Sequence, residues 1–237
     1  MSIADNIQRV HERIATACAR SGRDASEVTL VAVTKQQSVA AALAAVAAGL
    51  QHLGENRVEE AAVKIPPVDA AAAQPLTWHM VGHIQSRKAR QVAPLFDIVQ
   101  SIDSLRLAKR LSRLGHERER DLPALLQINV SGEASKYGLS GYHWHRDAAV
   151  HQRLWQEISA IMALPGLEVR GLMTMAPFGA EERVIRRVFA DMYALRESLD
   201  VRLPVLSMGM TDDFPIAIEE GATMIRVGRA IFGERNK

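Results

Sequence analysis

Apolar runs of strand length alternate with helix-period segments along this 237-residue sequence. Between the runs, apolar residues recur three and four positions apart, as they do on one face of a helix. The strand-like runs are 28–33, 51–54, 77–82, 98–102, 124–130, 167–175, 204–209 and 224–228. Strands that alternate with helices predict a parallel sheet, and eight such units without a dinucleotide fingerprint favour closure into a barrel. We therefore expect an α/β fold, a single (β/α)8 TIM barrel over residues 1–237, with an open doubly wound sheet as the alternative.

An extra helix is predicted before the first strand. Apolar residues occur at positions 3, 7, 10, 14 and 17, behind a Ser2-x-x-Asp5 sequence that is typical of a capping box. A further helix is expected to end at Gly115, whereas Pro66 and Pro67 indicate a loop or helix end. We expect the segment 141–146 to be an exposed excursion before a helix.

Composition narrows the class of protein. Hydrophobic residues make up 48% of the chain and charged residues 24%, which predicts a globular fold with a sizeable core. The formal net charge is only +2 and no basic run is present, so nucleic-acid binding is not expected. No apolar run approaches the roughly 20 residues needed to span a membrane, and the N-terminus lacks a signal-peptide core. The single cysteine, Cys18, cannot form an intrachain disulfide, and together these features predict a cytoplasmic protein.

A lysine follows the first predicted strand. Lys35 emerges from the apolar run 28–33 and would lie at the mouth of a barrel, where such folds place their active sites. A lysine forms a Schiff base only when its amine is unprotonated, which apolar walls or a neighbouring cation favour. The alternative is an ordinary solvated lysine at the end of a strand.

The last two predicted strands end in glycine and hydroxyl residues. Gly209 and Gly228 allow a close approach of the backbone, while Ser207 and Thr211 offer hydroxyl groups to an anion. Arg226 is expected at the rim of this phosphate cradle, with a salt bridge to a barrel carboxylate as the alternative. Together with Lys35, the cradle predicts an aldehyde cofactor that carries a phosphate.

Other catalytic chemistries lack their motifs. The eight histidines and single cysteine form no metal-ligand spacing, so no metal site is expected. His79 falls inside the third predicted strand and is interpreted as a buried, hydrogen-bonded histidine. Neither a Gly-x-Ser-x-Gly elbow nor a Gly-x-x-x-x-Gly-Lys loop occurs, which disfavours serine hydrolases and nucleotidases of those types.

A series of motifs covers nearly the whole chain in order. These are Val33-Thr-Lys35, Gly54-Glu-Asn56-Arg57, Trp78-His-Met-Val-Gly82-His-Ile-Gln85-Ser, Gln127-Ile-Asn129-Val, Ser135-Lys136-x-Gly138, Gly171-Leu-Met173, Ser207-Met-Gly-Met-Thr-Asp212 and Arg226-Val-Gly228-x-x-Ile-Phe-Gly233. With them the chain resembles the pyridoxal phosphate homeostasis protein family, whose members are similar to the barrel domain of alanine racemase. The resemblance implies that the chain holds pyridoxal 5′-phosphate, the vitamin B6 cofactor, without an established enzymatic turnover.

Carried over by position, the resemblance also implies a set of cofactor-binding residues. Lys35 is expected to form the Schiff base and Asn56 to lie beside the cofactor. The residues expected to hold the phosphate are Ser207, Gly209, Thr211, Arg226 and Gly228. Lys136 matches a family lysine near the mouth, for which a role in accepting or passing on the aldehyde is conjecture.

Catalytic requirements decide between a carrier and an enzyme. A racemase needs acid and base groups on both faces of the substrate carbon, and alanine racemase takes one of them from a second domain. We expect this chain to lack such a domain, because it ends at Lys237, soon after the eighth predicted strand. We therefore expect a monomer without catalytic residues that buffers pyridoxal phosphate or delivers it to apoenzymes. The alternatives are a small pyridoxal-dependent racemase or Schiff-base lyase, and a phosphosugar-type barrel enzyme without cofactor.

Overall fold

The computed structural model describes residues 2–234, in which short parallel strands alternate with helices. Five residues form the first strand, which carries an apolar side chain at all but its first position. The strands are β1 (Thr29–Val33), β2 (His52–Glu55), β3 (Thr77–Met80), β4 (Ile98–Ile102), β5 (Leu122–Asn129), β6 (Leu139–Ser140), β7 (Leu167–Met173), β8 (Val205–Ser207) and β9 (Met224–Val227). Eight of these match the predicted runs to within two residues at either end.

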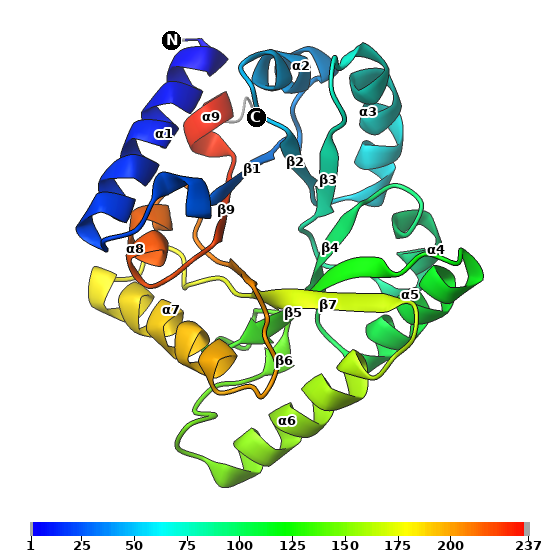
Figure 1. Cartoon of the computed structure of the whole chain (residues 1–237), viewed down its shortest axis with the longest axis vertical. Coiled ribbons are helices and arrows are strands. Elements are labelled where there is room, and N and C mark those ends of the chain that lie inside the picture. The colour runs from blue at the N-terminus through cyan, green and yellow to red at the C-terminus, as the bar shows by residue number, and fades with distance from the viewer. Residues whose placement is uncertain (1, 235–237) are drawn as a thin grey trace.

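Eight parallel strands close into a barrel, which confirms the predicted (β/α)8 fold (Figure 1). Neighbouring strands pair in the order β1, β2, β3, β4, β5, β7, β8 and β9, and β9 returns to β1. The short strand β6 pairs with β5 alone, outside this ring. The carboxyl ends of all eight barrel strands therefore open at one mouth.

Helices surround the barrel on its outer side (Figure 1). They are α1 (Ile3–Arg20), α2 (Val39–Ala47), α3 (Val58–Ala71), α4 (Ala89–Val92), α5 (Leu105–Glu117), α6 (Ala148–Met162), α7 (Glu182–Glu197), α8 (Phe214–Glu219) and α9 (Arg229–Phe232), with short 3-10 helices η1 (Ala25–Glu27) and η2 (Ser86–Lys88). The predicted extra helix is α1, which precedes β1 and packs against α8 and α9. Its predicted capping box is present, because the Ser2 hydroxyl accepts from the Asp5 backbone and the Asp5 carboxylate accepts from the Ser2 backbone.

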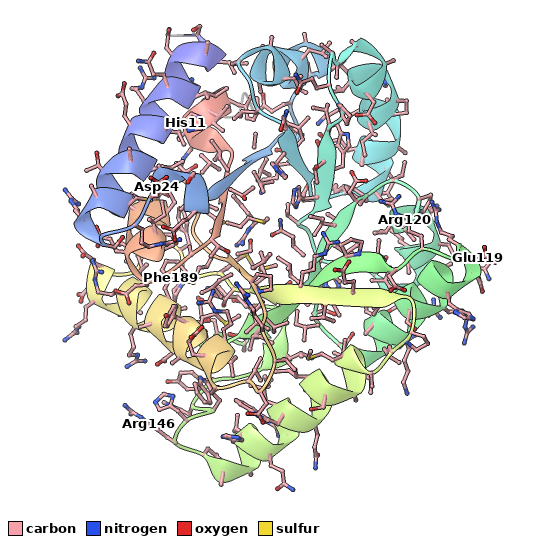
Figure 2. The ribbon with its side chains drawn as sticks, viewed as in Figure 1. His11, Asp24, Glu119, Arg120, Arg146 and Phe189 are labelled. Carbon is pink, nitrogen blue, oxygen red and sulfur yellow. The ribbon has the colours of Figure 1, made fainter. Side chains whose placement is uncertain are left out.

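Apolar side chains fill the space between strands and helices. Trp78, Phe189 and Phe214 are among the largest fully buried side chains. Phe189 lies on the barrel side of α7, whereas Glu119, Arg120 and Arg146 lie at the periphery (Figure 2). Among the described residues, no helix is long and apolar enough to cross a membrane.

Two predicted helix boundaries were wrong. The helix expected to end at Gly115 continues to Glu117, and this glycine instead permits close packing, since a Cβ there would lie 2.0 Å from the Gly166 carbonyl oxygen. Pro66 and Pro67 lie inside α3, which pattern analysis did not assign as a helix. The predicted excursion over 141–146 is confirmed only in part, because Trp144 is buried against Trp155.

Candidate functional site

The first and last strands of the barrel bring Lys35 close to the glycine turn after β9. Lys35 lies two residues beyond β1, in a turn, and is half-buried. Strand β9 pairs with β1, and a Cβ on Gly228 would lie 3.2 Å from the Val33 carbonyl oxygen. Gly228 therefore permits a close approach of the β9 end to the strand that carries the lysine.

The loop after β8 is hydrogen-bonded both to strand β9 and to α9, which follows that strand. The Arg226 backbone N–H donates to the Gly209 carbonyl at 3.0 Å, and the Thr211 hydroxyl accepts from the Ala230 N–H at 3.3 Å. Gly209 has φ of 93°, and a Cβ there would lie 2.6 Å from the Ala217 Cβ, so this position requires glycine. The two loops predicted to form the cradle are thus held side by side.

Arg226 lies inside the barrel, which corrects its expected position on the rim. Its side chain is buried, with Nη1 donating to the Ser207 hydroxyl at 2.6 Å and Nη2 to the Thr174 carbonyl at 2.9 Å. Burial lowers the Arg226 pKa to about 10, and the negative charge of Asp213 opposes this shift. The guanidinium therefore stays charged at neutral pH, and among residues 2–234 it donates to a hydroxyl and a backbone carbonyl and forms no salt bridge with a carboxylate.

A chain of polar side chains crosses the barrel from Ser207. The Ser207 hydroxyl donates to Gln100 Oε1 at 2.7 Å, and Gln100 Nε2 lies 2.8 Å from His79 Nδ1. His79 Nε2 in turn lies 3.0 Å from Nδ1 of His52. Since the Gln100 amide donates to His79 Nδ1, the His79 proton is assigned to Nε2. Because its only hydrogen points to Gln100, the Ser207 hydroxyl is already engaged, and its contact with a phosphate stays a prediction.

His79 is buried and hydrogen-bonded at both ring nitrogens, as the sequence predicted. Burial lowers its pKa to about 3, and the neighbouring His52 adds to this shift. The ring is therefore neutral at physiological pH and does not act as an acid there.

Asn56 follows β2 and carries a buried polar atom that lacks a partner. No hydrogen bond reaches its Oδ1 atom from any described residue. The adjacent backbone is tightly packed, since a Cβ on Gly82 would lie 2.2 Å from the Asn56 carbonyl oxygen. A buried acceptor without a partner costs free energy, so a ligand that donates to it would relieve that cost.

A histidine and an aspartate pair after strands β3 and β4. His83 Nδ1 lies 2.7 Å from Asp103 Oδ2, and the Tyr137 ring stacks on the His83 ring with centroids 3.7 Å apart. Beside them, Lys136 donates to the Met175 carbonyl at 3.0 Å and pairs with Glu133. The sequence analysis assigned no role to this pair.

Sequence analysis missed Lys64, a buried cation near the first two strand ends. Its Nζ atom donates to the Thr34 carbonyl at 2.6 Å, to Glu55 Oε1 at 2.6 Å and to Glu60 Oε1 at 2.7 Å. A signal was available, because Lys64 falls on the apolar stripe of α3 formed by positions 58, 61, 65 and 68. A lysine on such a stripe predicts a buried partner.

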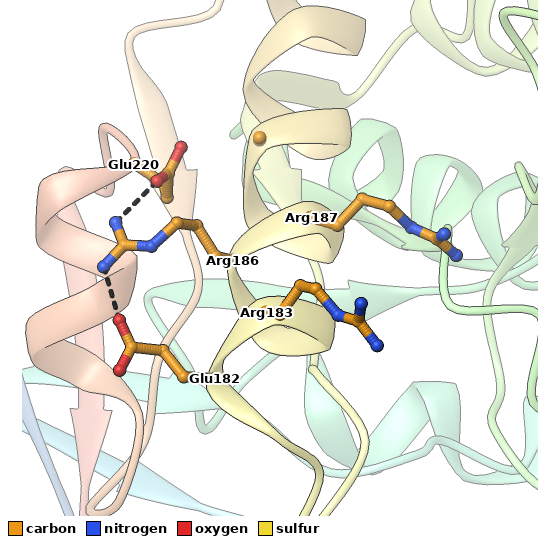
Figure 3. A pocket seen from close by; sticks show the side chains of 6 residues that line it. Glu182, Arg183, Arg186, Arg187 and Glu220 are labelled. Carbon is orange, nitrogen blue, oxygen red and sulfur yellow. Dashed lines mark hydrogen bonds and ion pairs between the residues drawn. The ribbon is translucent and has the colours of Figure 1, made fainter.

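A separate surface pocket of about 580 Å³ lies on α7, outside the barrel (Figure 3). Its lining consists of Glu182, Arg183, Arg186, Arg187, Ala190 and Glu220. Arg186 pairs with Glu182, Glu219 and Glu220, and these carboxylates raise its pKa above the ordinary value for arginine. None of the residues predicted to bind the cofactor lines this pocket. Residues 2–234 contain no group of three or more His, Cys, Asp or Glu side chains arranged to hold a metal ion.

A family profile and a shared fold define the class of protein to which the chain belongs. The sequence profile described as "Alanine racemase, N-terminal domain" matches residues 3–236. Alanine racemase from Clostridium difficile superposes with a TM-score of 0.70 over 98% of this chain and 58% of that chain, at 13% identity, which shows the shared fold alone.

Relatives of similar length then define the family. The "Pyridoxal phosphate homeostasis protein" of Pseudomonas aeruginosa is 42% identical over 99% of this chain and 96% of the relative. The protein of the same name from Escherichia coli K12 is 39% identical over 99% of this chain and 97% of the relative. The structure of PipY from Synechococcus elongatus with PLP bound has a TM-score of 0.77 and 37% identity, covering 94% of this chain and 100% of that chain. The chain belongs to the pyridoxal phosphate homeostasis protein family.

Proposed function

We propose that the protein binds pyridoxal 5′-phosphate through a Schiff base at Lys35 and buffers or delivers this cofactor in the cell. The observation that carries the proposal is the position of Lys35, two residues beyond the strand whose Val33 carbonyl lies beside Gly228. An aldehyde held there would have its phosphate next to the loops of Gly209 and Thr211. The structure of PipY with PLP bound supports the choice of cofactor.

The residues present fit this cofactor in charge and in hydrogen-bonding capacity. The proposed phosphate ligands are Ser207, Gly209, Thr211, Arg226 and Gly228, with Asn56 beside the ring. Arg226 brings a buried positive charge, and Asn56 Oδ1 is an acceptor in need of a donor. When bound, pyridoxal phosphate supplies an aldehyde, whose carbon forms a C=N bond to Lys35 Nζ as water leaves. The protein's part is to hold the phosphate and to present an unprotonated amine.

A carrier role suits the relatives and the site. The relatives are named for pyridoxal phosphate homeostasis, and a racemase would need an acid and a base on opposite faces of the substrate carbon. We propose a cytoplasmic monomer that passes the cofactor to apoenzymes. Light scattering of the loaded protein tests the monomer, and cofactor transfer to an apoenzyme in solution tests delivery.

A second candidate function is a weak pyridoxal-dependent racemase or lyase. The observation in its favour is the pairing of His83 with Asp103, since a carboxylate that orients a histidine is a common feature of acid–base sites. Prolonged incubation with L-amino acids, followed by chiral chromatography, tests it. Sustained inversion that depends on Lys35 would make the protein an enzyme.

Absorbance spectroscopy tests the Schiff base. Wild-type protein incubated with pyridoxal phosphate should be yellow, with a band that shifts on borohydride reduction. Lys35→Ala should lack this band, while Lys136→Ala, which alters the other candidate lysine, should keep it. A reduced adduct that maps to a lysine other than Lys35 would contradict the proposal.

A further inference from the structure

The turn that carries Lys35 is bound on both sides by one charged cluster. Lys64 Nζ donates to the carbonyl of Thr34, the residue before Lys35, at 2.6 Å. Glu60 Oε1 accepts from the backbone N–H of Gln36, the residue after Lys35, and also from Lys64 Nζ at 2.7 Å. Two backbone groups that flank the lysine are thus connected through a single ion pair.

The Lys64 ammonium has no N–H to spare. It offers three N–H donors, and the three acceptors are the Thr34 carbonyl, Glu55 Oε1 and Glu60 Oε1. Its side chain is only 5% exposed, and that of Glu55 is fully buried. Water therefore does not compete well for these hydrogen bonds, and the cluster holds the backbone in one position.

The turn itself needs such support. The Gln37 N–H donates to the Thr34 carbonyl at 2.9 Å, which closes a turn with Lys35 and Gln36 in its centre. Gln36 has φ of 61°, a left-handed conformation that turns of this kind normally assign to glycine. Such a conformation is unfavourable in a residue with a side chain and persists only where neighbouring contacts enforce it. The bond from Gln36 N–H to Glu60 is a contact of that sort.

Burying the charged groups of this cluster also costs free energy of folding. Glu55 Oε2 is buried without a hydrogen-bond partner, although Thr34 Oγ1 and Lys64 both donate to the other oxygen. Burial raises the pKa of Glu55, while the hydrogen bonds from Lys64 and Thr34 oppose this shift. Apolar residues of similar volume often replace a buried ion pair without loss of stability. Stability alone therefore does not explain a charged cluster at this place.

We propose that Glu60 and Lys64 are positioning residues that hold the Lys35 turn so that the Lys35 amine meets the cofactor aldehyde. This inference rests on the proposed function, because it assigns the cluster a role in Schiff-base formation. It concerns the covalent step alone and not the phosphate cradle, whose loops follow β8 and β9. The cluster lies between α3 and the ends of β1 and β2.

The test separates the covalent step from phosphate binding. Pyridoxal phosphate reports both, whereas pyridoxine 5′-phosphate carries an alcohol in place of the aldehyde and reports non-covalent binding of the ring and phosphate alone. Glu60→Ala should slow growth of the Schiff-base band about tenfold, since small displacements of a reacting group cost up to about a hundredfold in rate. Its affinity for pyridoxine 5′-phosphate, measured by calorimetry, should stay within about twofold of wild type, because that cradle is untouched.

Two further variants provide controls. Glu59→Ala removes the neighbouring carboxylate on α3, which is exposed and pairs with Lys88, and it should behave as wild type in both measurements. Glu60→Gln keeps an oxygen that accepts from Gln36 N–H, so it should restore most of the rate lost in Glu60→Ala.

Three other results would contradict either the positioning role or the proposed function. Equal rates for Glu60→Ala and Glu59→Ala would overturn the positioning role. Equal losses of pyridoxal phosphate and pyridoxine 5′-phosphate binding in Glu60→Ala would mean that the cluster only supports the fold, which also overturns it. A wild-type protein that binds pyridoxine 5′-phosphate but never forms the band would overturn the proposed function, and this inference with it.

Discussion

Two buried cations near the predicted site differ in what surrounds their charge. Lys64 donates to two carboxylates, Glu55 and Glu60, as well as to a backbone carbonyl. Arg226 donates to a hydroxyl and a backbone carbonyl, both of them neutral, and Asp213 acts on it only through space. A buried charge is costly unless it is paired. Lys64 is paired by the protein itself, whereas Arg226 is left able to attract an anion.

This comparison separates two uses of buried charge. The Lys64 cluster immobilises backbone on either side of Lys35, so its acceptors are part of the chain. The hydrogen-bond partners of Arg226 are neutral, so the proposed phosphate would supply a negative charge that these partners lack. We therefore expect substitution of Lys64 to lower stability as well as to disturb the Lys35 turn, and substitution of Arg226 to affect mainly ligand affinity.

The largest effect is expected for Lys64→Met. Methionine has a similar length but leaves Glu55 and Glu60 without their cation, and breaking a buried ion pair on one side costs about 3–5 kcal/mol. Urea denaturation of the ligand-free protein measures this free energy of unfolding. Lys88→Met, which breaks the exposed pair with Glu59, is the control and should change it by well under about 1 kcal/mol. A Lys64→Met protein as stable as the control would show that the cluster is not coupled to folding.

A smaller effect, on binding, is expected for Arg226→Gln. Loss of a charged hydrogen-bond donor lowers the affinity for pyridoxine 5′-phosphate by about 1.5–3 kcal/mol, or roughly tenfold to a hundredfold. Arg170→Gln is the control, because Arg170 is an exposed arginine on β7 that pairs with Glu168. This variant should bind pyridoxine 5′-phosphate as tightly as wild type does. The same substitution should lower the affinity for pyridoxine, which has no phosphate, much less than the affinity for pyridoxine 5′-phosphate. Equal losses for both ligands would place Arg226 against another part of the cofactor.

The barrel could be predicted from the sequence because its signals are local. Apolar runs such as 98–102 alternate with amphipathic helices, and that pattern depends on neighbouring positions alone. The Ser2 and Asp5 capping box is likewise complete within four residues. The span of α3 was missed because Pro66 and Pro67 oppose a helix locally, while burial of Ile65 and Val68 favours it through tertiary packing.

The site could be predicted only as far as strand ends determine it. The sequence placed Lys35, Asn56 and Gly228 at the mouth, since residues after parallel strands share one edge of the barrel. It could not show that the Arg226 side chain turns into the barrel, because that depends on contacts with Ser207 and Thr174 from other strands. Residues that join distant strands leave no periodic signal.

Lowering the pH tests whether His79 is neutral in the folded protein. This histidine belongs to the chain of hydrogen-bonded side chains that leads to Arg226. The His79 pKa is about 3 in the folded protein, well below its ordinary value of 6.5. Below pH 6.5 the unfolded state therefore binds a proton that the folded state does not, and stability falls as pH falls. The loss is about 1.4 kcal/mol per pH unit from pH 6.5 toward pH 3, or about 2 kcal/mol at pH 5. Above pH 6.5 this contribution to stability is fully present.

Comparison with His79→Gln removes this contribution together with the interaction between His79 and His52. Carboxylates such as Glu55 and Asp213, whose pKa values burial raises, titrate alike in both proteins and cancel in the difference. Urea denaturation at a series of pH values should give a flatter profile for His79→Gln between pH 6.5 and pH 4.5. Parallel profiles would mean that the His79 pKa in the folded protein stays close to its ordinary value of 6.5, which would contradict the prediction.

The smallest effect, on the free energy of unfolding, is expected for Arg186. Unlike Arg226, it is partly exposed and all its ion-pair partners are carboxylates. Three carboxylates surround it, Glu182, Glu219 and Glu220, but its side chain is 37% exposed. Figure 3 shows the bonds to Glu182 and Glu220 at the surface pocket. Water and salt screen these pairs, so Arg186→Met should cost less than about 1 kcal/mol and progressively less at high salt. Urea denaturation at low and high ionic strength measures both values. A cost as large as that of Lys64→Met, independent of salt, would show that the number of carboxylates matters more than burial.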